Sequence, residues 1–403
     1  MRILIVSQYF WPENFRINEL SIDLHSKGHK VTVLTAYPNY PEGFFLKDFL
    51  KNKKNYSNYH GIEVIRVPII PRGKRKVQLI LNYLSFIING TLIGLYKLRK
   101  YNFDIVFVFQ TSPVFVGIPS SIISYIKKCP QIFWVLDLWP ETLSAINIIK
   151  NKWLILLIRK IVKLIYSRCE VILVQSKSFI NEIKKYGHKK VHYFPAWVES
   201  EFLDSPANLA KEINREKEIF TIIFAGNIGK AQDFPSILKT VELLINNNFH
   251  NFRIVTIGEG SEKAWLINEV YERKLNNYFQ ILDQYPLKKM KSFFAHADAL
   301  LVTLSNANIF KMTIPGKIQT YLASGVPILG MLSGEGAFVI KESKAGYVCK
   351  AGDYEGLASL IMKMSKNKKK KKAMLGNNGI EYYKQEFNKT SLLKKLESIM
   401  FDL

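Results

Sequence analysis

Residues that could perform acid–base and anion-binding chemistry follow expected strands in the first half of the chain. Glu13 follows the first strand and precedes a helix, and Asp137 follows the fifth. Asn39 and Tyr40 lie in the loop after the second strand. An open parallel sheet binds its ligand at the carboxyl ends of its strands, and a helix that begins there favours an anion. These residues therefore predict a ligand site with carboxylates along one edge of a sheet.

The second half of the chain offers glycines and amines at corresponding places. Residues 226–232, Gly-Asn-Ile-Gly-Lys-Ala-Gln, directly follow an expected strand. Further along, Gly316 and Lys317 open a helix, so that a lysine stands in its first turn. The helix N-terminus and the ammonium group both favour an anion there. We expect the sites of the two halves to converge on one cleft between two domains.

Several common catalytic and cofactor motifs are missing from the sequence. Each Gly-Lys pair is followed by Arg, Ala or Ile, so the phosphate loop that requires Ser or Thr at that place is absent. Gly258-Glu259-Gly260 lacks the third glycine of a dinucleotide fingerprint and places an acid where a pyrophosphate would approach. There is no GxSxG, HExxH or D-x-D motif. The sequence therefore predicts no metal site.

Composition and charge narrow the class of protein. Of 403 residues, 48% are apolar and 13% aromatic, which is enough for two cores and excludes a disordered chain. Three cysteines exclude a disulfide framework and fit a reducing cytoplasm. The formal charge is +24, of which residues 1–200 carry +17 from 29 Lys+Arg and 12 Asp+Glu. That half is expected to meet an anionic lipid or a phosphorylated substrate; nucleic acid is not expected, because no nucleic-acid motif is present.

Short apolar runs alternate with longer helical patterns, which predicts two α/β, doubly wound domains with parallel sheets. A polar break at residues 195–217 separates them. We predict an N-terminal domain at 1–200 and a C-terminal domain at 201–384, with a last helix at about 385–403 that packs back on the first. The expected strands are Ile3–Val6, Val31–Thr35, Val64–Val67, Ile105–Phe109, Ile132–Leu136, Val171–Gln175, Val191–Phe194, Phe220–Ala225, Arg253–Ile257, Phe279–Leu282, Ala299–Thr303, Pro327–Met331 and Tyr347–Cys349.

Two apolar helices raise the question of a membrane. Val77 to Tyr96 are twenty residues without a charge, and a basic run from Arg72 to Lys76 precedes them. Their polar residues would form one stripe, which favours a helix packed on the core; docking in a membrane interface and a true span stay open. Trp153 to Arg168 combines a basic face with apolar residues and could pack on the domain or on an anionic membrane. The stripe consists of Gln78, Asn82, Ser85 and Asn89.

Six motifs in order carry a resemblance to a known family. The chain resembles the retaining, nucleotide-sugar-dependent glycosyltransferases of family 4. Within it the chain is similar to the branch that builds bacterial surface polysaccharides, including the N-acetyl-L-fucosaminyl transferases of O antigen and capsule synthesis. The resemblance implies a GT-B fold, with the acceptor on the N-terminal domain, a UDP-sugar on the C-terminal one, and no metal or other cofactor. The motifs are Tyr9–Glu13, Gly28–Thr35, Pro38–Gly43, Asp137–Glu141, Ala225–Gln232, and Pro315–Lys317 with Tyr321–Pro327.

The resemblance assigns donor-binding roles residue by residue. Lys317, with Gly316, matches the family's lysine near the donor diphosphate, where a cation stabilises the leaving group. Thr320 replaces the glutamate that usually holds the ribose. In the first loop, Arg16 is expected to approach the diphosphate in place of a glycine pair. The family's Arg and Lys after the first strand of the second domain correspond to Asn227 and Gln232, with Lys230 between them.

The acceptor side follows in the same way. Asp137 is predicted to receive the proton of the acceptor hydroxyl or to orient the acceptor, with Glu13 as a second candidate. A rival interpretation makes Asp137 a cap of the helix near Pro140. Asn39 and the rings of Tyr40 and Trp139 are the expected acceptor contacts, although both rings could equally pack in the core.

Together these observations predict a glycosyltransferase that moves a sugar from UDP to a polyprenyl-diphosphate-linked saccharide. The sugar would be N-acetyl-L-fucosamine or a related deoxyamino sugar. The basic N-terminal half of the chain predicts a peripheral protein at the inner face of the bacterial cell membrane. The alternative is a UDP-sugar 2-epimerase or hydrolase on the same scaffold, since a fold alone does not define a function.

Overall fold

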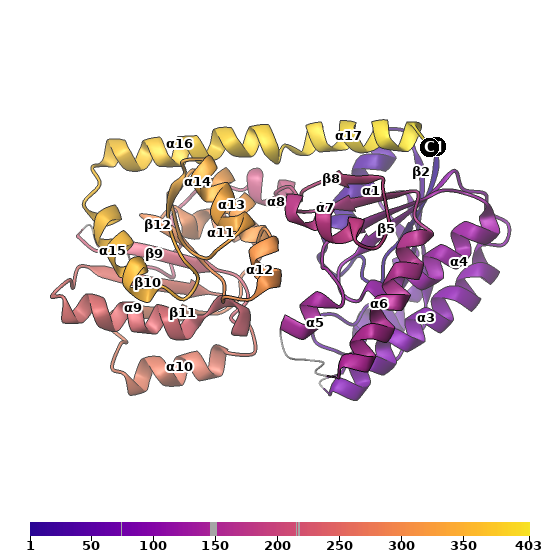
Figure 1. The fold of residues 1–403 in the computed structure, drawn as a ribbon. Helices are drawn as coiled ribbons and strands as arrows, with labels where there is room; N and C mark the ends of the chain where they lie inside the picture. The colour runs from indigo at the N-terminus through magenta and orange to yellow at the C-terminus, as the bar shows by residue number, and fades with distance from the viewer. Residues whose placement is uncertain (74, 146–150, 215, 217) are drawn as a thin grey trace. The chain divides into compact units, whose positions relative to one another are not determined.

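The computed structural model describes residues 1–73, 75–145, 151–214, 216 and 218–403. The chain divides into two compact units, drawn in Figure 1. The N-terminal unit consists of Met1–Gln175, Phe179–Phe194 and Leu396–Leu403, and the C-terminal unit of Ser176–Ser178 and Pro195–Lys395. The observed boundary at 194/195 lies six residues before the predicted one at 200/201.

The N-terminal unit contains an eight-stranded sheet in the order β3-β4-β2-β1-β5-β6-β7-β8. Its pairings are parallel except for the antiparallel pair β3 and β4. Every residue of β5 is buried, as expected for a strand covered on both faces by helices. The strands are β1 Arg2–Val6, β2 Lys30–Ala36, β3 Asn58–Tyr59, β4 Ile62–Val67, β5 Ile105–Gln110, β6 Gln131–Val135, β7 Val171–Val174 and β8 Val191–Tyr193.

Helices connect these strands and cover the sheet. The loop after β4 leads into α3, which packs against β4, β2 and α4, and α4 also contacts α6. The helices of residues 1–194 are α1 Arg16–Ser26, α2 Lys47–Lys51, η1 Lys53–Tyr56, α3 Lys76–Leu98, η2 Val114–Val116, α4 Gly117–Lys127, α5 Glu141–Ala145, α6 Lys152–Ser167 and α7 Lys177–Lys184.

The C-terminal unit contains a six-stranded parallel sheet in the order β11-β10-β9-β12-β13-β14. Alternate residues of β9 enter different cores: Ile223 and Ala225 lie in one, Ile222 and Phe224 in the other. This period of two is that of a strand buried on both faces. The strands are β9 Phe220–Ala225, β10 Phe252–Ile257, β11 Phe279–Leu282, β12 Ala299–Thr303, β13 Ile328–Met331 and β14 Gly346–Cys349.

The helices of residues 195–403 surround this second sheet and end the chain. They are α8 Ser200–Leu203, η3 Lys230–Gln232, α9 Phe234–Asn246, α10 Lys263–Glu272, α11 Leu287–Phe294, α12 Asn308–Met312, α13 Gly316–Ser324, α14 Glu335–Glu342, α15 Tyr354–Ser365, α16 Lys369–Glu386 and α17 Lys389–Phe401. The end of α17 belongs to the N-terminal unit, where Glu397 pairs with Lys27 at 2.7 Å and with His29 at 3.3 Å.

The predicted doubly wound α/β class is confirmed, and each expected strand overlaps an observed one. The two-residue strand β3 was missed because Asn58–Tyr59 contains no apolar run. The segment Val77 to Tyr96 packs on the core, as favoured, but only along one side: in the 18-residue window of this helix 22% is buried, so docking in a membrane interface stays a prediction. Helix α3 rests on the core along one narrow side and leaves a wide apolar side exposed.

Candidate functional site

Glu13 joins two loops at the carboxyl edge of the first sheet. Its side chain is buried, and Oε1 accepts hydrogen bonds from the backbone N–H groups of Asn39 and Tyr40, both at 2.7 Å. Oε2 accepts a third from Phe10 N–H at 3.3 Å. Burial raises the pKa of Glu13 to about 7, although the three N–H groups oppose this by favouring the carboxylate. Both oxygens are thus engaged within the unit, so Glu13 fixes the loops that surround the site.

Asn39 and Tyr40 play different parts in the same loop. The amide of Asn39 is buried; its Oδ1 accepts from the backbone N–H of Arg72 at 2.8 Å and from Asn82 Nδ2 at 3.3 Å. This side chain braces three segments and offers no surface to an acceptor. Tyr40 is 38% exposed, and its ring lies 5.4 Å from that of Tyr9. Of the two residues, Tyr40 presents the ring that could contact a sugar.

Asp137 lies two residues beyond the end of β6 with its carboxylate half-buried. Its backbone carbonyl is held by Gln110 Nε2 at 3.1 Å, whereas its side chain makes no hydrogen bond to a described residue. Burial raises the pKa of Asp137 to about 6. The described part of α5 gives no support to the capping role, because no N–H group there donates to this carboxylate. Asp137 is therefore an acid with a fixed backbone and no hydrogen-bond partner for its carboxylate among the described residues.

Trp139 packs inside the N-terminal unit. Its ring is 4% exposed, meets Phe115 edge-on at 5.4 Å, and donates through Nε1 to Ser112 Oγ at 3.1 Å. No face of the indole is open to a sugar, so the core-packing alternative describes this residue.

Two residues that the sequence analysis did not place in the site join it in the structure. Arg72 Nη1 donates to the hydroxyl of Tyr9 at 3.1 Å, and its guanidinium lies 5.5 Å from the centroid of the Tyr40 ring. Tyr83, on α3, interacts electrostatically with both Arg72 and Asp137. Spacing could not reveal them, because Arg72 stands in a basic run and Tyr83 in an apolar helix. Arg16, the remaining candidate of this unit, is half-buried at the first position of α1.

In the C-terminal unit, Lys317 is the distinctive group. Its Nζ is fully covered, lies 3.6 Å from the centroid of the Phe224 ring, and has no hydrogen-bond partner among the described residues. Burial lowers the pKa of Lys317 to about 7. A Cβ atom added to Gly226 would stand 3.3 Å from this Nζ, so the amine lies directly beside the loop that follows β9. An unpaired buried amine next to backbone N–H groups is suited to receive a phosphate.

The Gly258-Glu259-Gly260 segment packs against that loop. A Cβ atom on Gly258 would approach the carbonyl oxygen of Gly226 to 2.0 Å, and one on Gly260 that of Ile228 to 2.2 Å. Ile228 N–H also donates to the Glu259 carbonyl at 2.8 Å. The two glycines of this incomplete dinucleotide fingerprint therefore let two loops lie in contact at the sheet edge, a role that the motif pattern alone did not indicate.

The other donor candidates differ in how far they are exposed. Gly316 is exposed and has no atom within 4 Å of its Cβ position, and Thr320 follows Lys317 by one helical turn on α13. Asn227 and Lys230 are exposed in the segment after β9. Gln232 is half-buried there, and its backbone carbonyl accepts a hydrogen bond from the hydroxyl of Thr303. In the described ranges, no three His, Cys, Asp or Glu residues form a metal-binding group; that the reaction needs no metal stays a prediction.

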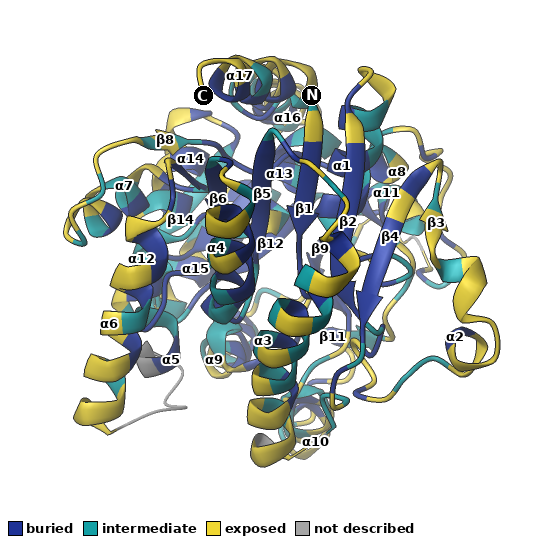
Figure 2. Ribbon diagram, turned by 90° about the vertical axis from the view of Figure 1, so that its right-hand side faces the viewer, coloured by how far each residue is buried: buried dark blue, intermediate teal, exposed yellow. Residues whose placement is uncertain are grey.

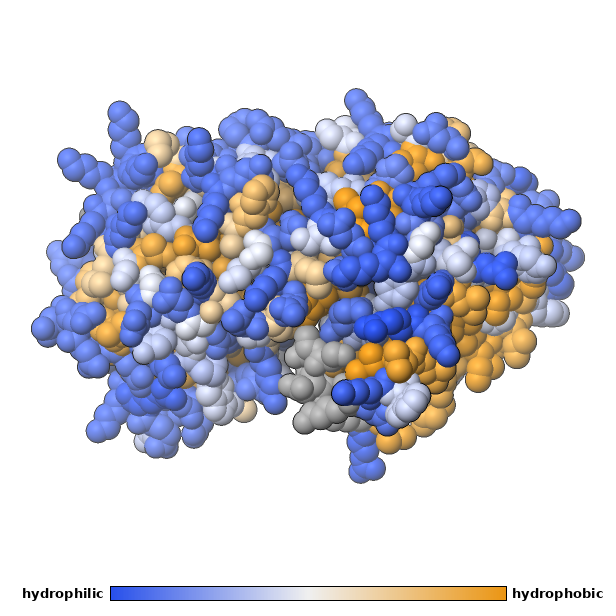
Figure 3. Space-filling model, viewed as in Figure 1, coloured by the Kyte–Doolittle hydropathy of each residue, from blue (hydrophilic) through white to orange (hydrophobic). Residues whose placement is uncertain are grey.

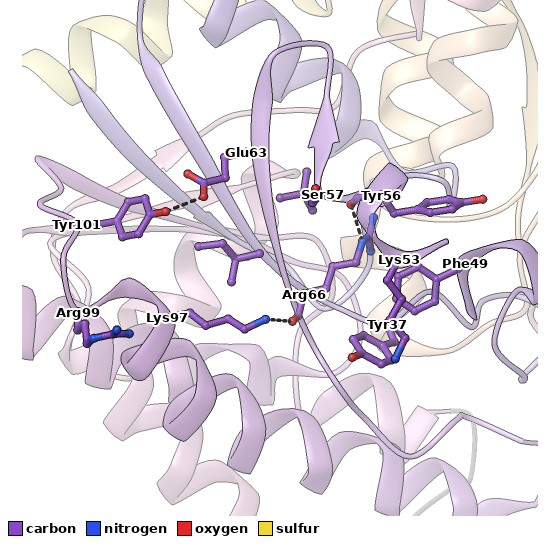
Figure 4. Close-up of a pocket in the computed structure, with 12 residues that line it drawn as sticks. Tyr37, Phe49, Lys53, Tyr56, Ser57, Glu63, Arg66, Lys97, Arg99 and Tyr101 are labelled. Atoms are coloured by element: carbon purple, nitrogen blue, oxygen red, sulfur yellow. Dashed lines mark hydrogen bonds between the residues drawn. The ribbon is translucent and has the colours of Figure 1, made fainter. Parts of the chain in front are cut away.

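A cavity of about 450 Å³ lies beside β4. Figure 4 shows the residues that line it. Arg66 crosses its wall and donates to the carbonyl of Tyr56 at 3.1 Å, while Lys97 Nζ donates to the Arg66 carbonyl at 3.0 Å. Beyond the cavity, Arg66 also reaches the carbonyls of Ala36 and Trp11. This cluster braces the loops that carry Glu13 and Asn39 from behind.

Comparison with known proteins decides the family. A model described as Glycosyltransferase Family 4 matches residues 15–202, and one described as Glycosyl transferases group 1 matches residues 206–382. The chain belongs to the family 4 glycosyltransferases. As a member it is a retaining glycosyltransferase, as predicted. No curated protein matches its sequence.

Solved structures confirm the GT-B fold of this family 4 enzyme. Sucrose-phosphate synthase from Thermosynechococcus elongatus aligns with a TM-score of 0.76 and 12% identity over 100% of this chain and 98% of its own. HepE from Anabaena, in complex with UDP and glucose, gives 0.70 and 14% over 100% of both chains. WaaG, a glycosyltransferase involved in lipopolysaccharide biosynthesis, gives 0.65 and 13% over 99% of both.

Proposed function

We propose that this glycosyltransferase moves a deoxyamino sugar, such as N-acetyl-L-fucosamine, from UDP to a polyprenyl-diphosphate-linked saccharide at the inner face of the bacterial cell membrane. The product would enter O antigen or capsule synthesis. The choice of sugar and pathway rests on the motif resemblance, and that of UDP also on HepE, whose structure holds UDP. The membrane and the lipid-linked acceptor rest on an observation in the N-terminal unit.

That observation is the inverted polarity of α3. Its polar stripe faces the protein: Asn82 Nδ2 donates to the Ile70 carbonyl at 2.6 Å, Asn89 Nδ2 donates to the Pro68 carbonyl at 2.7 Å, and Ser85 Oγ accepts from Ile70 N–H at 2.9 Å. The opposite side is apolar and exposed from Val77, at 67%, to Leu92, at 64%. A water-facing helix has the reverse arrangement, so α3 is built for an apolar surrounding on its outer side.

Two neighbouring helices extend this surface, which we name the apolar face. Exposed residues of α3, α4 and α6 appear together in Figure 2, and apolar side chains gather over α3 and α4 in Figure 3. Trp153, 81% exposed, begins the contribution of α6. The apolar face comprises Val77, Ile80, Leu81, Leu84, Ile88, Leu92, Tyr96, Ile122, Tyr125, Ile126, Trp153, Leu154, Leu156, Leu157 and Leu164.

Exposed cations border the apolar face. Lys160 and Lys163 on α6 line a cavity of about 500 Å³ with Arg159, and Arg75 precedes α3. Near an anionic leaflet each such cation contributes about 1 kcal/mol. Of the basic run before α3, Lys74 and the side chain of Lys76 lie outside the described residues. A membrane-associated enzyme with a lipid-linked substrate accounts for both the apolar face and its cationic border.

The proposed chemistry assigns one role to each unpartnered group. Lys317, with the loop around Gly226, would bind the UDP diphosphate and stabilise its negative charge as the glycosidic bond to UDP breaks. Asp137 would accept the proton of the acceptor hydroxyl, whose oxygen forms the new bond to the same face of the sugar. At neutral pH a carboxyl with a pKa of about 6 is mostly ionised and ready to take that proton.

A donor screen tests the function. UDP-sugars are incubated with the enzyme and a lipid-linked monosaccharide in bacterial membranes, and the product is identified by mass. The expected product is the acceptor with one added sugar and its lipid still attached. Turnover of UDP-sugar in the absence of acceptor would favour the epimerase or hydrolase alternative instead.

Vesicle binding tests the apolar face separately. Replacement of Ile80, Leu84 and Ile88 by Asp should release the enzyme from anionic vesicles, because three charges would enter the apolar contact. The same replacement by Asp at Ile267, an exposed apolar residue of α10, is the control and should leave vesicle binding unchanged. Equal binding by the triple variant and the wild type would contradict the membrane proposal.

A further inference from the structure

The guanidinium group of Arg72 contacts tyrosines but is paired with no acid among the described residues. Its side chain is half-buried, and among the described residues only the Tyr9 hydroxyl accepts a hydrogen bond from it, at 3.1 Å. None of the ion pairs between described residues involves Arg72. Its backbone, by contrast, is fixed, because its N–H donates to Asn39 Oδ1 at 2.8 Å. The result is a positioned cation whose remaining N–H groups are available.

Arg66, a few residues earlier, shows what a structural arginine looks like in the same unit. Its three nitrogens donate to three backbone carbonyls, those of Tyr56, Ala36 and Trp11. Exposed Arg2 is likewise satisfied, by both a 2.6 Å and a 3.1 Å bond to one oxygen of Asp104. Among the described residues no carbonyl or carboxylate accepts from the Arg72 side chain, so its remaining N–H groups are free to bind a ligand.

The surroundings of Arg72 specify an anion that also carries a sugar. The hydroxyl of the buried Tyr9 side chain accepts from Arg72, and Tyr83 interacts with Arg72 from α3. The exposed ring of Tyr40 lies under the guanidinium at 5.5 Å. Tyr83 also interacts electrostatically with Asp137, so one phenol lies near both Arg72 and the predicted proton acceptor. A phosphate beside Arg72 would have its attached sugar next to Asp137.

Helix α3 connects this site with the apolar face. Arg72 lies in the loop that leads into α3, and Tyr83 lies on the helix itself. The neighbouring residues Ile80 and Leu84 are exposed on its outer side. In a lipid-linked saccharide the phosphate stands between the lipid and the first sugar, so a cation in the loop that leads into the apolar helix α3 suits that phosphate.

We propose that Arg72, with the hydroxyls of Tyr9 and Tyr83, binds the phosphate group that joins the lipid to the acceptor sugar. This inference rests on the proposed function, because it requires a lipid-linked acceptor. It makes Arg72 the residue by which the enzyme distinguishes phosphate-linked acceptors from neutral glycosides. Arg72 is a binding residue in this proposal and takes no part in proton transfer.

The test uses two soluble acceptors with the same sugar on the same short alkyl chain. One is joined through a diphosphate and the other through a neutral glycosidic bond, and kcat/KM is measured for each without membranes. Arg72→Gln should lower kcat/KM for the diphosphate acceptor about tenfold to a hundredfold, mainly through KM, since hydrogen bonds to charged groups are lost. Its kcat/KM for the neutral acceptor should stay unchanged, and Arg72→Lys should recover part of the loss.

Arg99→Gln is the matched control, because Arg99 is an exposed arginine at the other end of α3. This variant should have the kcat/KM of the wild type for both acceptors. UDP binding and thermal unfolding of each variant confirm that it is folded. Equal losses on both acceptors in Arg72→Gln would overturn the inference while leaving the proposed function intact. Failure of the wild type to use any lipid-linked acceptor would overturn both.

A second arm separates the acceptor phosphate from the phosphates of membrane lipids. Binding of Arg72→Gln to vesicles of anionic phospholipid should equal that of the wild type. If the variant loses vesicle binding but discriminates between the two soluble acceptors as the wild type does, Arg72 binds lipid head groups, and the acceptor-phosphate assignment is wrong.

Discussion

The ligand edges of the two sheets contain buried or half-buried ionisable groups that differ in whether a hydrogen bond holds them. Burial moves the pKa of Glu13, Asp137 and Lys317 toward neutrality, to about 7, 6 and 7. Glu13 accepts three backbone hydrogen bonds, whereas the side chains of Asp137 and Lys317 have none to a described residue. A buried charge without a partner is costly. Glu13 therefore stabilises the loops around the site, whereas Asp137 and Lys317 are the groups expected to gain their partners when a substrate binds.

Replacement of Lys317 should have the largest effect. Lys317→Ala removes the predicted cation at the leaving diphosphate, and kcat should fall about a hundredfold to a thousandfold, as for the loss of one transition-state donor. Steady-state transfer to the lipid-linked acceptor measures this. Lys341→Ala, at an exposed position of α14, is the control and should behave as the wild type. Wild-type turnover in Lys317→Ala would show that the unpartnered amine is not part of the reaction.

Asp137→Asn should come next. The amide keeps the size of the carboxyl group and loses its basicity, so kcat should fall about a hundredfold with UDP binding unchanged. Asp104→Asn serves as the control, because Asp104 is a partly exposed acid already paired with Arg2 at 2.6 Å. If Asp137→Asn lowers only the thermal stability and leaves kcat unchanged, Asp137 has a structural role and is not the proton acceptor.

The same contrast predicts a pH dependence of UDP binding. With a pKa near 7 in the free enzyme, Lys317 is protonated below pH 7 and increasingly neutral above it. A bound diphosphate favours the ammonium form and raises this pKa, so binding takes up a proton. The Kd for UDP should therefore rise above pH 7, by up to about tenfold per pH unit. Calorimetry in buffers of different ionisation enthalpy measures the proton uptake, which should disappear in Lys317→Ala; uptake that persists there would assign it to another group.

The sequence predicted the fold and the unpartnered groups for the same reason. Strands buried on both faces are continuous apolar runs. Asp137 stands two residues after a strand and Lys317 in the first turn of a helix, so the order of elements along the chain locates both residues. Arg72 and Tyr83 come from a loop and a helix that fold over the sheet edge, and no spacing links them to Asp137. The polar stripe of α3 was recognised, but periodicity identifies two sides of a helix without saying which one faces the core.

Replacement of Glu13 should have the smallest effect on turnover and a distinct effect on stability. In Glu13→Gln the amide nitrogen must face one of the three N–H groups that the carboxylate now accepts, which costs about 1–3 kcal/mol of unfolding free energy. The sign of its pH dependence follows from the raised pKa. Between the unfolded value near 4.3 and about 7, the folded state binds more protons, so this group makes stability fall as pH rises through that window. Urea unfolding at pH 5 and pH 8 should show a smaller difference for Glu13→Gln than for the wild type. A loss of turnover as large as that of Asp137→Asn, with stability unchanged, would make Glu13 a participant in the reaction and remove the distinction between partnered and unpartnered groups.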